Sequence, residues 1–337
     1  MLNHKIDLAG FISMALLGLA LCTAAEAGLY KCTDRNNKIY YQDKPCQDLI
    51  AARLPSNLTR LAGKEEERAF FWKASGEKGT VFLLGAPHFG DKSFYPLPQM
   101  VIDSVSNADA VVVESDIWNY DDKARAGALK GRGRYEDKKD NLENHVLSVT
   151  WNKAVDMGNK LGINEEMLRQ YKPWLASLLL ASESLKQSGF YNPDMDLDKT
   201  FLKNTQGKKP IMELESVEEQ VSLFDGLSGR EQEQMLLQTL NALGRGPDRY
   251  KTIAEAWKKG DLEYMDQIVK QPFDNGDVSM KLLKLFFEDR SERIANRLKE
   301  LAEDGRTYFA VVGAGYLGGD KGVLKLLEAK GFKVVQP

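Results

Sequence analysis

The chain of 337 residues is long enough to bury one large domain, or one large domain with a small appendage. Its 46 lysine and arginine residues nearly balance 49 aspartate and glutamate residues, which leaves a formal net charge of −3. Without a dominant positive field, the chain is not expected to bind nucleic acid.

The N-terminal 27 residues have the pattern of a cleavable export signal. His4 and Lys5 precede an apolar stretch at residues 8–22, and residues 25–27 (Ala-Glu-Ala) offer a cleavage site. The apolar stretch is shorter than the roughly 20 residues of a membrane span. No second stretch of spanning length follows, so we expect a periplasmic or secreted protein with no membrane span in its mature chain.

Residues 28–47 predict a small β-hairpin, in which two β-type runs flank turn residues at 34–37. Cys32 and Cys46 would remain after signal removal, and an even pair in an exported chain favours a disulfide that staples the hairpin. The unit resembles a short domain of unknown function found at the N-termini of bacterial envelope proteins, through Tyr30, Asp34, Tyr41, Asp43 and Pro45. Residues 48–68 then predict a partly helical linker.

A main domain is expected over residues 69–337, with alternating apolar runs and helical stretches. Its fold class is α/β, with a central β-sheet, two similar strand motifs and a long helical middle region. Strands are predicted at residues 70–74, 79–85, 110–113, 210–215, 307–313 and 332–335. Helices are predicted at residues 99–106, 142–183 with an interruption at 172–174, 217–300 and 322–330, with Trp174 and Trp257 as core anchors.

Two stretches of the chain, residues 79–91 and 305–320, resemble each other. Each is an apolar strand followed by Gly-Ala-x, a ring-bearing residue, an apolar residue and glycine. Glycine after a strand allows a sharp turn, so the motifs are expected to deliver His88 and Tyr316 to the mouth of the sheet. We expect the two turns to meet at a pseudo-symmetric centre. Paired histidines there would suit a divalent metal, but the second position is a tyrosine.

Carboxylates follow two of the other predicted strands. Glu114 and Asp116 come after residues 110–113, at the edge where open α/β sheets bind ligands. They would serve as metal ligand and general base, or form an exposed loop with salt bridges. Glu215 ends the strand at 210–215, as a pocket residue or a strand-end cap. Arg290 would stabilise an anion or pair with Glu114.

The main domain resembles the TraB/GumN family, which is related to Tiki-type and erythromycin-esterase-like proteins. The resemblance is carried in order by residues 84–88, 94–98, 113–116, 172–174, 207–216 with Gln220, 256–257 with 260–261, Arg290, and 312–315 with Leu317 and Gly322. Members of the family typically have two Gly-x-x-His motifs and a glutamate after a strand. That set is similar to a divalent-metal hydrolase site, and Tiki-type relatives are metal-dependent proteases.

Three positions depart from the family pattern. Ala86 stands where threonine is common, Ser291 where asparagine is usual, and Tyr316 where the second histidine belongs. A neutral phenol is a poorer ligand than imidazole, because its proton, with a pKa of about 10, must first be lost. A bound metal lowers that pKa, so ligation by tyrosinate stays open.

The resemblance implies a hydrolase in which one divalent ion on His88 and Glu114 activates water for attack on a peptide or ester carbonyl. Arg290 would be a third catalytic residue, with Tyr316, Asp116 and Glu215 lining the pocket. The competing hypothesis is a non-catalytic envelope protein that binds a peptide or small molecule in the retained pocket. A third is a structural role in envelope assembly through the stapled hairpin.

Overall fold

The computed structural model describes residues 30–33, 39–42, 69–90, 92–115, 127, 129, 131–137, 139–192, 195–205, 207–246, 248–273 and 276–337. The predicted signal at 1–27, the linker at 48–68, Cys46 and Asp116 lie outside these residues. The two predicted hairpin strands are present as β1 (Tyr30–Thr33) and β2 (Ile39–Gln42), which pair antiparallel. The disulfide between Cys32 and Cys46 therefore stays a prediction.

The core of the molecule is a six-stranded sheet with the order β6-β5-β7-β4-β3-β8. Four neighbouring strands are parallel, and β3 and β8 complete one edge in antiparallel pairing. The strands are β3 (Phe71–Ser75), β4 (Thr80–Ala86), β5 (Ala110–Val113), β6 (Ile211–Glu213), β7 (Thr307–Gly313) and β8 (Lys333–Val335). Each strand was predicted from its apolar run. The α/β class is therefore confirmed.

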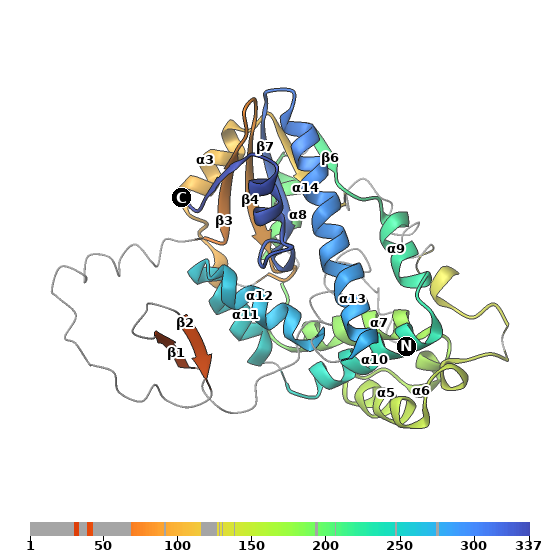
Figure 1. Ribbon diagram of the computed structural model, residues 1–337. Helices are drawn as coiled ribbons and strands as arrows, with labels where there is room; N and C mark the ends of the chain where they lie inside the picture. Colours follow the sequence, from red (N-terminus) through yellow and green to blue (C-terminus); the bar gives the residue numbers. More distant parts are fainter. Residues whose placement is uncertain are drawn as a thin grey trace.

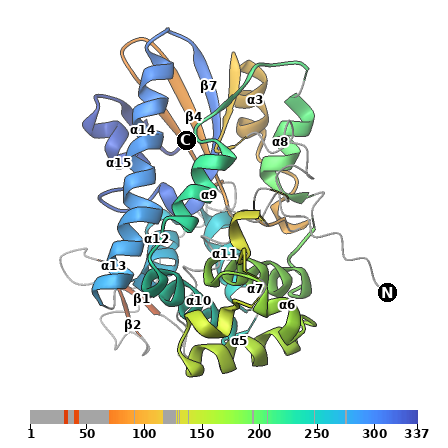
Figure 2. The same ribbon diagram turned by 90° about the vertical axis from the view of Figure 1, so that its right-hand side faces the viewer.

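The two central strands, β4 and β7, are the longest, and most of their residues are buried. They pair in parallel from Thr80 with Thr307 to Ala86 with Gly313. A parallel strand with helices on both faces has no solvated side, which explains why the sequence runs are continuously apolar rather than alternating. Figure 2 shows α14 and α15 on one side of the sheet and α3 and α8 on the other.

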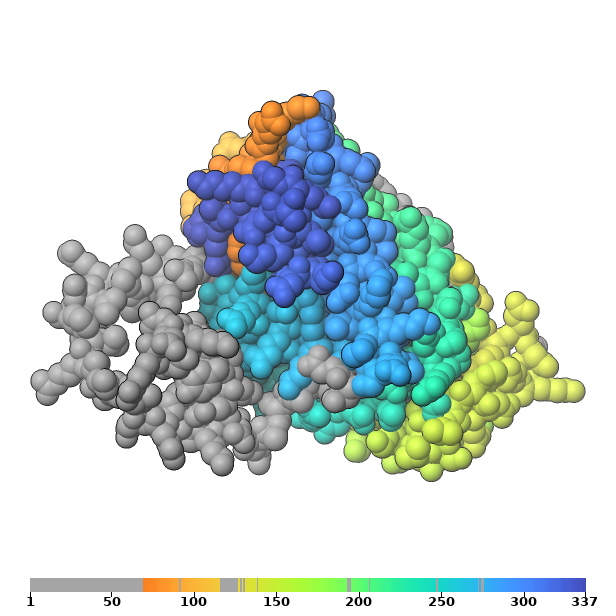
Figure 3. All heavy atoms as spheres, viewed as in Figure 1, coloured from red at the N-terminus to blue at the C-terminus, as the bar shows by residue number. Residues whose placement is uncertain are grey.

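The helical middle of the chain forms the lower half of the molecule, below the sheet in Figure 1. The principal helices are α3 (Gln99–Asn107), α5 (Ser148–Lys160), α6 (Glu165–Arg169), α7 (Pro173–Gln187), α8 (Leu197–Thr205), α9 (Val217–Asp225), α10 (Gly229–Leu243), α11 (Asp248–Lys259), α12 (Leu262–Lys270), α13 (Asp277–Leu283), α14 (Asp289–Ala302) and α15 (Val323–Ala329). Helix α14 runs from this half up to the sheet. In Figure 3 the C-terminal residues, in dark blue, pack beside it on the same face.

The stretch predicted as one interrupted helix over residues 142–183 is more divided than expected. A 3-10 turn at Leu142–His145 is followed by α5, α6 and α7. The break after α5 falls at Gly162, whose φ of 76° lies in the left-handed region that ends helices. Pro173 occupies the first turn of α7, where its missing N–H costs nothing, so it begins a helix rather than interrupting one.

Among the described residues, none of the helices combines the length and the apolar composition that a bilayer crossing requires.

Candidate functional site

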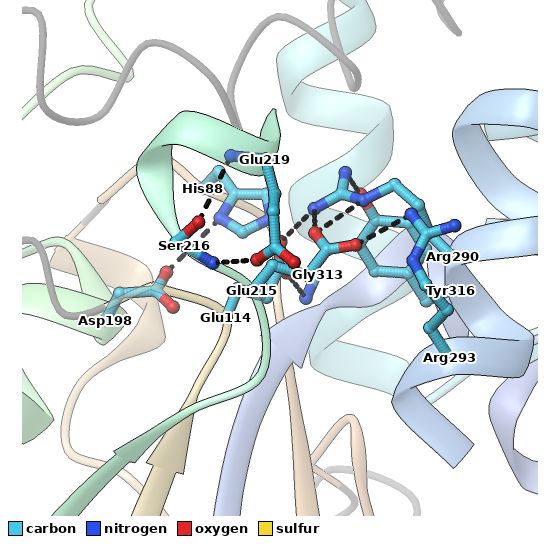
Figure 4. A network of polar contacts seen from close by, with 10 residues as sticks. All are labelled: His88, Glu114, Asp198, Glu215, Ser216, Glu219, Arg290, Arg293, Gly313 and Tyr316. Atoms are coloured by element: carbon cyan, nitrogen blue, oxygen red, sulfur yellow. Dashed lines mark hydrogen bonds and ion pairs between the residues drawn. The ribbon is translucent and has the colours of Figure 1, made fainter. Parts of the chain in front are cut away.

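The carboxyl ends of the parallel strands bring together five of the predicted site residues. His88 follows β4, Glu114 follows β5, Glu215 follows β6, Tyr316 follows β7, and Arg290 enters from α14. All five are almost completely buried, with relative exposures between 0% for Arg290 and 6% for His88. Figure 4 shows them as one network of polar contacts. Residues more than two hundred positions apart therefore face one another, as the sequence motifs predicted.

His88 lies between two carboxylates. Its Nε2 is 3.5 Å from Glu114 Oε1, and its Nδ1 is 3.3 Å from Asp198 Oδ2. Burial alone would lower the pKa of His88, but the hydrogen bonds and charges of Asp198 and Glu114 outweigh burial and raise it to about 10. His88 also has a φ of 54°, which is rare for a residue with a side chain. Such backbone strain is typical of functional positions.

Asp198 was not among the predicted site residues. It lies in the first turn of α8. Asp196 directly precedes this helix, and its carboxylate accepts a hydrogen bond from the Lys199 amide at 3.0 Å. Burial and the nearby charge of Asp198 raise the pKa of Asp196 to about 6. The Asp-x-Asp pattern before an apolar run signals a helix start. Only tertiary packing places that helix start against His88, so local sequence could not reveal the contact.

Glu114 is held by three partners. Its Oε1 accepts a short hydrogen bond from the Gly313 amide, and its Oε2 lies 3.1 Å from Arg290 Nη2. Burial alone would raise the pKa of Glu114, but the contact with His88, the charge of Arg290 and the Gly313 amide lower it to about 2. Glu114 is therefore an ionised carboxylate at neutral pH, and it is a buried site residue rather than part of an exposed loop.

Arg290 is the centre of the network. Its Nε and Nη2 donate to Glu215 Oε2 at 2.8 and 2.5 Å, and its Nη1 contacts the Tyr316 hydroxyl. The other oxygen of Glu215 accepts from Arg293 at 2.9 Å. Arg290 was predicted either to stabilise an anion or to pair with Glu114, and it does pair with Glu114. Glu215 is 5% exposed, so it belongs to the site and is not a surface residue.

Tyr316 is the ring-bearing residue of the second strand–glycine motif. Its ring lies under the Arg290 guanidinium, 4.7 Å from ring centroid to Cζ, and packs against Phe287. Burial raises the pKa of the Tyr316 hydroxyl well above its ordinary value, although the charge of Arg290 opposes this effect. The phenol is therefore neutral, and its oxygen faces a guanidinium.

Gly313 allows the close packing of this centre. A Cβ at this position would lie 2.5 Å from His88 Nε2 and 3.0 Å from Glu114 Oε1. A side chain of any size would therefore push apart the two groups that the fold brings together. The glycine serves close approach rather than an unusual backbone angle, since its φ is −55°.

The two strand–glycine motifs lie side by side but differ in detail. In the parallel register Gly85 pairs with Val312 and Ala86 with Gly313, so the two Gly-Ala pairs are offset by one residue. The turn after β4 carries His88 in the left-handed region, whereas the turn after β7 is a 3-10 turn at Ala314–Tyr316. The expected pseudo-symmetry of the two turns is not seen in this local geometry, because each turn closes differently.

Two side chains of the centre, His88 and Glu114, are placed to bind one divalent cation. Once His88 Nε2 has lost its proton, it and Glu114 Oε1 are close enough to reach one ion at the usual bond lengths of about 2.0–2.2 Å. Asp198 lies behind Nδ1, where metal-binding histidines commonly have a carboxylate partner. A third protein ligand is usual at catalytic zinc. Within the described part of the chain, no cluster of three or more such side chains is found that could hold an ion.

Comparison with known proteins gives a family match over most of the chain. The model of the TraB/PrgY/gumN family matches residues 70–336. An uncharacterized protein of Treponema pallidum (strain Nichols) is 24% identical over 212 residues, 61% of this chain and 59% of the relative. The uncharacterized protein YbaP of Escherichia coli (strain K12) is 25% identical over 144 residues, 42% of this chain and 50% of the relative. The chain thus spans between half and three fifths of these relatives, and no solved structure matches it.

Proposed function

This chain belongs to the TraB/PrgY/gumN family, and we propose that it is an exported protein of hydrolase ancestry whose centre holds one divalent cation on His88 and Glu114. The observation that carries the proposal is the arrangement around His88. One ring nitrogen faces the Glu114 carboxylate, and the other faces Asp198. A carboxylate behind a ring nitrogen fixes the tautomer and the ring orientation that metal ligation needs.

Within this centre the chain's own residues have distinct roles. Asp198 orients the imidazole, and the Gly313 amide and Arg290 hold the two oxygens of Glu114 in place. Arg290 also keeps positive charge beside the centre, where an anionic intermediate would need it. A bound divalent cation would supply an activated water and polarise the carbonyl of a peptide or ester substrate.

A second candidate function is binding without catalysis, and the contact between Tyr316 and Arg290 favours it. The phenol is buried and neutral, and it contacts a guanidinium. Arg290 lies against Glu114 as well, so a fixed cation already balances that carboxylate. Under this candidate the protein would bind a peptide or small molecule in the family's pocket after losing a metal ligand.

Metal analysis of the purified protein separates the two candidates. We expect about one divalent ion per chain in the wild type after incubation with Mn²⁺, Co²⁺ or Zn²⁺ and gel filtration. His88→Ala should lose the ion, whereas His145→Ala, at an exposed histidine paired with Asp140, should keep it. A wild-type protein that retains no ion and cleaves no peptide or ester in a substrate panel would overturn the hydrolase and leave binding alone.

The Tyr316→His substitution tests whether a histidine at position 316 strengthens metal binding. The substitution restores an imidazole to the centre, and we expect metal affinity to rise by more than about tenfold, measured by calorimetric titration. Tyr316→Phe is the matched control, because it removes the hydroxyl without adding a ligand. Equal metal affinity in the two variants would show that position 316 does not face the ion.

A further inference from the structure

A cavity lies outside the charged centre. It has a volume of about 650 Å³ and opens between α3 and α8, which lie next to each other in Figure 2. Ligand pockets commonly have volumes of about 300–1,000 Å³. Helix α8 separates the two sites along its length, because Asp198 in its first turn faces His88 whereas Thr200, Phe201 and Asn204 line the cavity.

The walls of this cavity are largely apolar. They are formed by Leu97, Ile102, Val105 and Phe201, with Tyr95 and Pro96. Ile102 is 39% exposed although the helix that carries it packs against β7. The free energy of burying apolar surface is about 25 cal/mol per Å², so covering these walls would favour an aliphatic ligand.

The cavity is rigid at its Tyr95 side. The Tyr95 hydroxyl donates to Thr200 Oγ1 at 3.0 Å and lies 3.2 Å from the Met195 carbonyl oxygen. These contacts tie the loop before α3 to the first turns of α8. Because these hydrogen bonds fix the two walls relative to each other, a ligand would lose little free energy to ordering them on entry.

One end of the cavity is positively charged. Lys209 Nζ donates to the carbonyl oxygens of Ser106 and Ala108 at 2.9 and 2.5 Å, which fixes this lysine against the end of α3. Lys208 is adjacent and exposed, and it has no carboxylate partner in the described part of the chain. The described residues that line the cavity include two lysines and no acidic side chain. The expected ligand is therefore anionic at one end and apolar along its length.

We propose that this cavity binds a long-chain carboxylate, with its alkyl tail against Ile102 and Phe201 and its head group beside Lys208. The site is separate from the centre around His88, so the inference does not depend on metal binding or hydrolysis there.

Fluorescence titration of the purified protein with a fluorescent long-chain fatty acid tests this inference. We expect saturable binding of one ligand per chain, competed by hexadecanoate but not by butyrate, because the short acid lacks the tail. The methyl ester should compete more weakly by about fivefold, since it lacks the charge that faces Lys208. Equal competition by butyrate and hexadecanoate, or no saturable binding at all, would overturn the proposal.

Two variants locate the ligand, and each has a matched control. Ile102→Asp places a charge on the apolar wall and should weaken binding by more than about tenfold. Val149→Asp, at an aliphatic residue 57% exposed on α5, should not. Lys208→Glu should weaken binding by about fivefold, whereas Lys203→Glu, on the exposed side of α8, should have no effect. Binding that is unchanged in both cavity variants would place the ligand elsewhere and refute the site.

Discussion

At the residue scale, the centre is an ion network that depends on one fully buried guanidinium. Arg290 contacts Glu114, Glu215 and Tyr316, and none of these side chains is more than 5% exposed. Buried charges are tolerated only when their partners are present, because water no longer solvates them. The network therefore supports the position of His88 and Glu114 as well as their charge states.

Arg290→Met should lower the free energy of unfolding by about 3–5 kcal/mol, because it leaves Glu114 and Glu215 buried without a counter-charge. Urea unfolding followed by circular dichroism measures the loss. Arg297→Met is the matched control on the same helix, since Arg297 is half exposed and pairs with the exposed Glu300. We expect the control to change stability by less than about 0.5 kcal/mol. Similar losses in the two variants would contradict the network's role.

Most of the centre could be predicted from sequence, because four of its residues follow recognisable strands. His88, Glu114 and Tyr316 follow apolar runs, and parallel strands end at one edge of a sheet. Asp198 could not be predicted, since it reaches His88 only through the packing of α8 against the sheet. Asp116 stays a prediction, because it lies outside the described residues.

At the element scale, the starts of two helices are fixed by local side chains. Ser216 and Glu219 form a reciprocal capping box at α9, and Ser228 with Glu231 forms another at α10. Each box satisfies amide groups that a helix start otherwise leaves without partners. The division of residues 142–183 was less well predicted, because the break at Gly162 was missed and the proline taken as an interruption begins α7.

Glu231 makes the stability of α10 dependent on pH. Its pairing with Lys281 of α13, and the hydrogen bonds from Ser228 at 2.7 and 2.8 Å, lower the pKa of its carboxyl, although burial opposes this. A lowered folded-state pKa contributes stability above the unfolded value of about 4.3, and that contribution is lost as pH falls through the folded value.

Glu231→Gln should therefore cost stability at pH 7 and much less near pH 3, where the wild type has lost the same contribution. Urea unfolding at the two pH values measures the difference. Glu166→Gln, at an exposed carboxylate in α6, serves as the control and should change stability by less than about 0.5 kcal/mol at pH 7. A Glu231→Gln deficit that is as large at pH 3 as at pH 7 would contradict the assignment.

At the scale of the whole molecule, the helical half and the sheet are joined at a few specific contacts. The Trp257 indole N–H of α11 donates to the Gly85 carbonyl of β4 at 2.5 Å. Its ring packs against Phe94, close to the turn that follows β4. Both predicted core anchors, Trp174 and Trp257, are buried, so that expectation is confirmed. Their partners could not be predicted, because each contact joins segments distant in sequence.

Trp257→Phe should destabilise the protein by about 1 kcal/mol more than Trp174→Phe. Both changes remove a similar indole volume, but only Trp257 loses a hydrogen bond, since the Trp174 indole has no acceptor among the described residues. Thermal and urea unfolding of the two variants measure the difference. If Trp174→Phe costs as much as Trp257→Phe, the contact with Gly85 does not stabilise the joint between the two halves.

The position of β7 in the sheet has a consequence for how the chain is made. This strand lies between β4 and β5, yet it is synthesised more than two hundred residues after β4. Until residues 307–313 have left the ribosome, both earlier strands keep an unpaired edge, which is a template for aggregation. A product that stops before Thr307 cannot close its sheet, so the centre around His88 can assemble only after β7 has been synthesised.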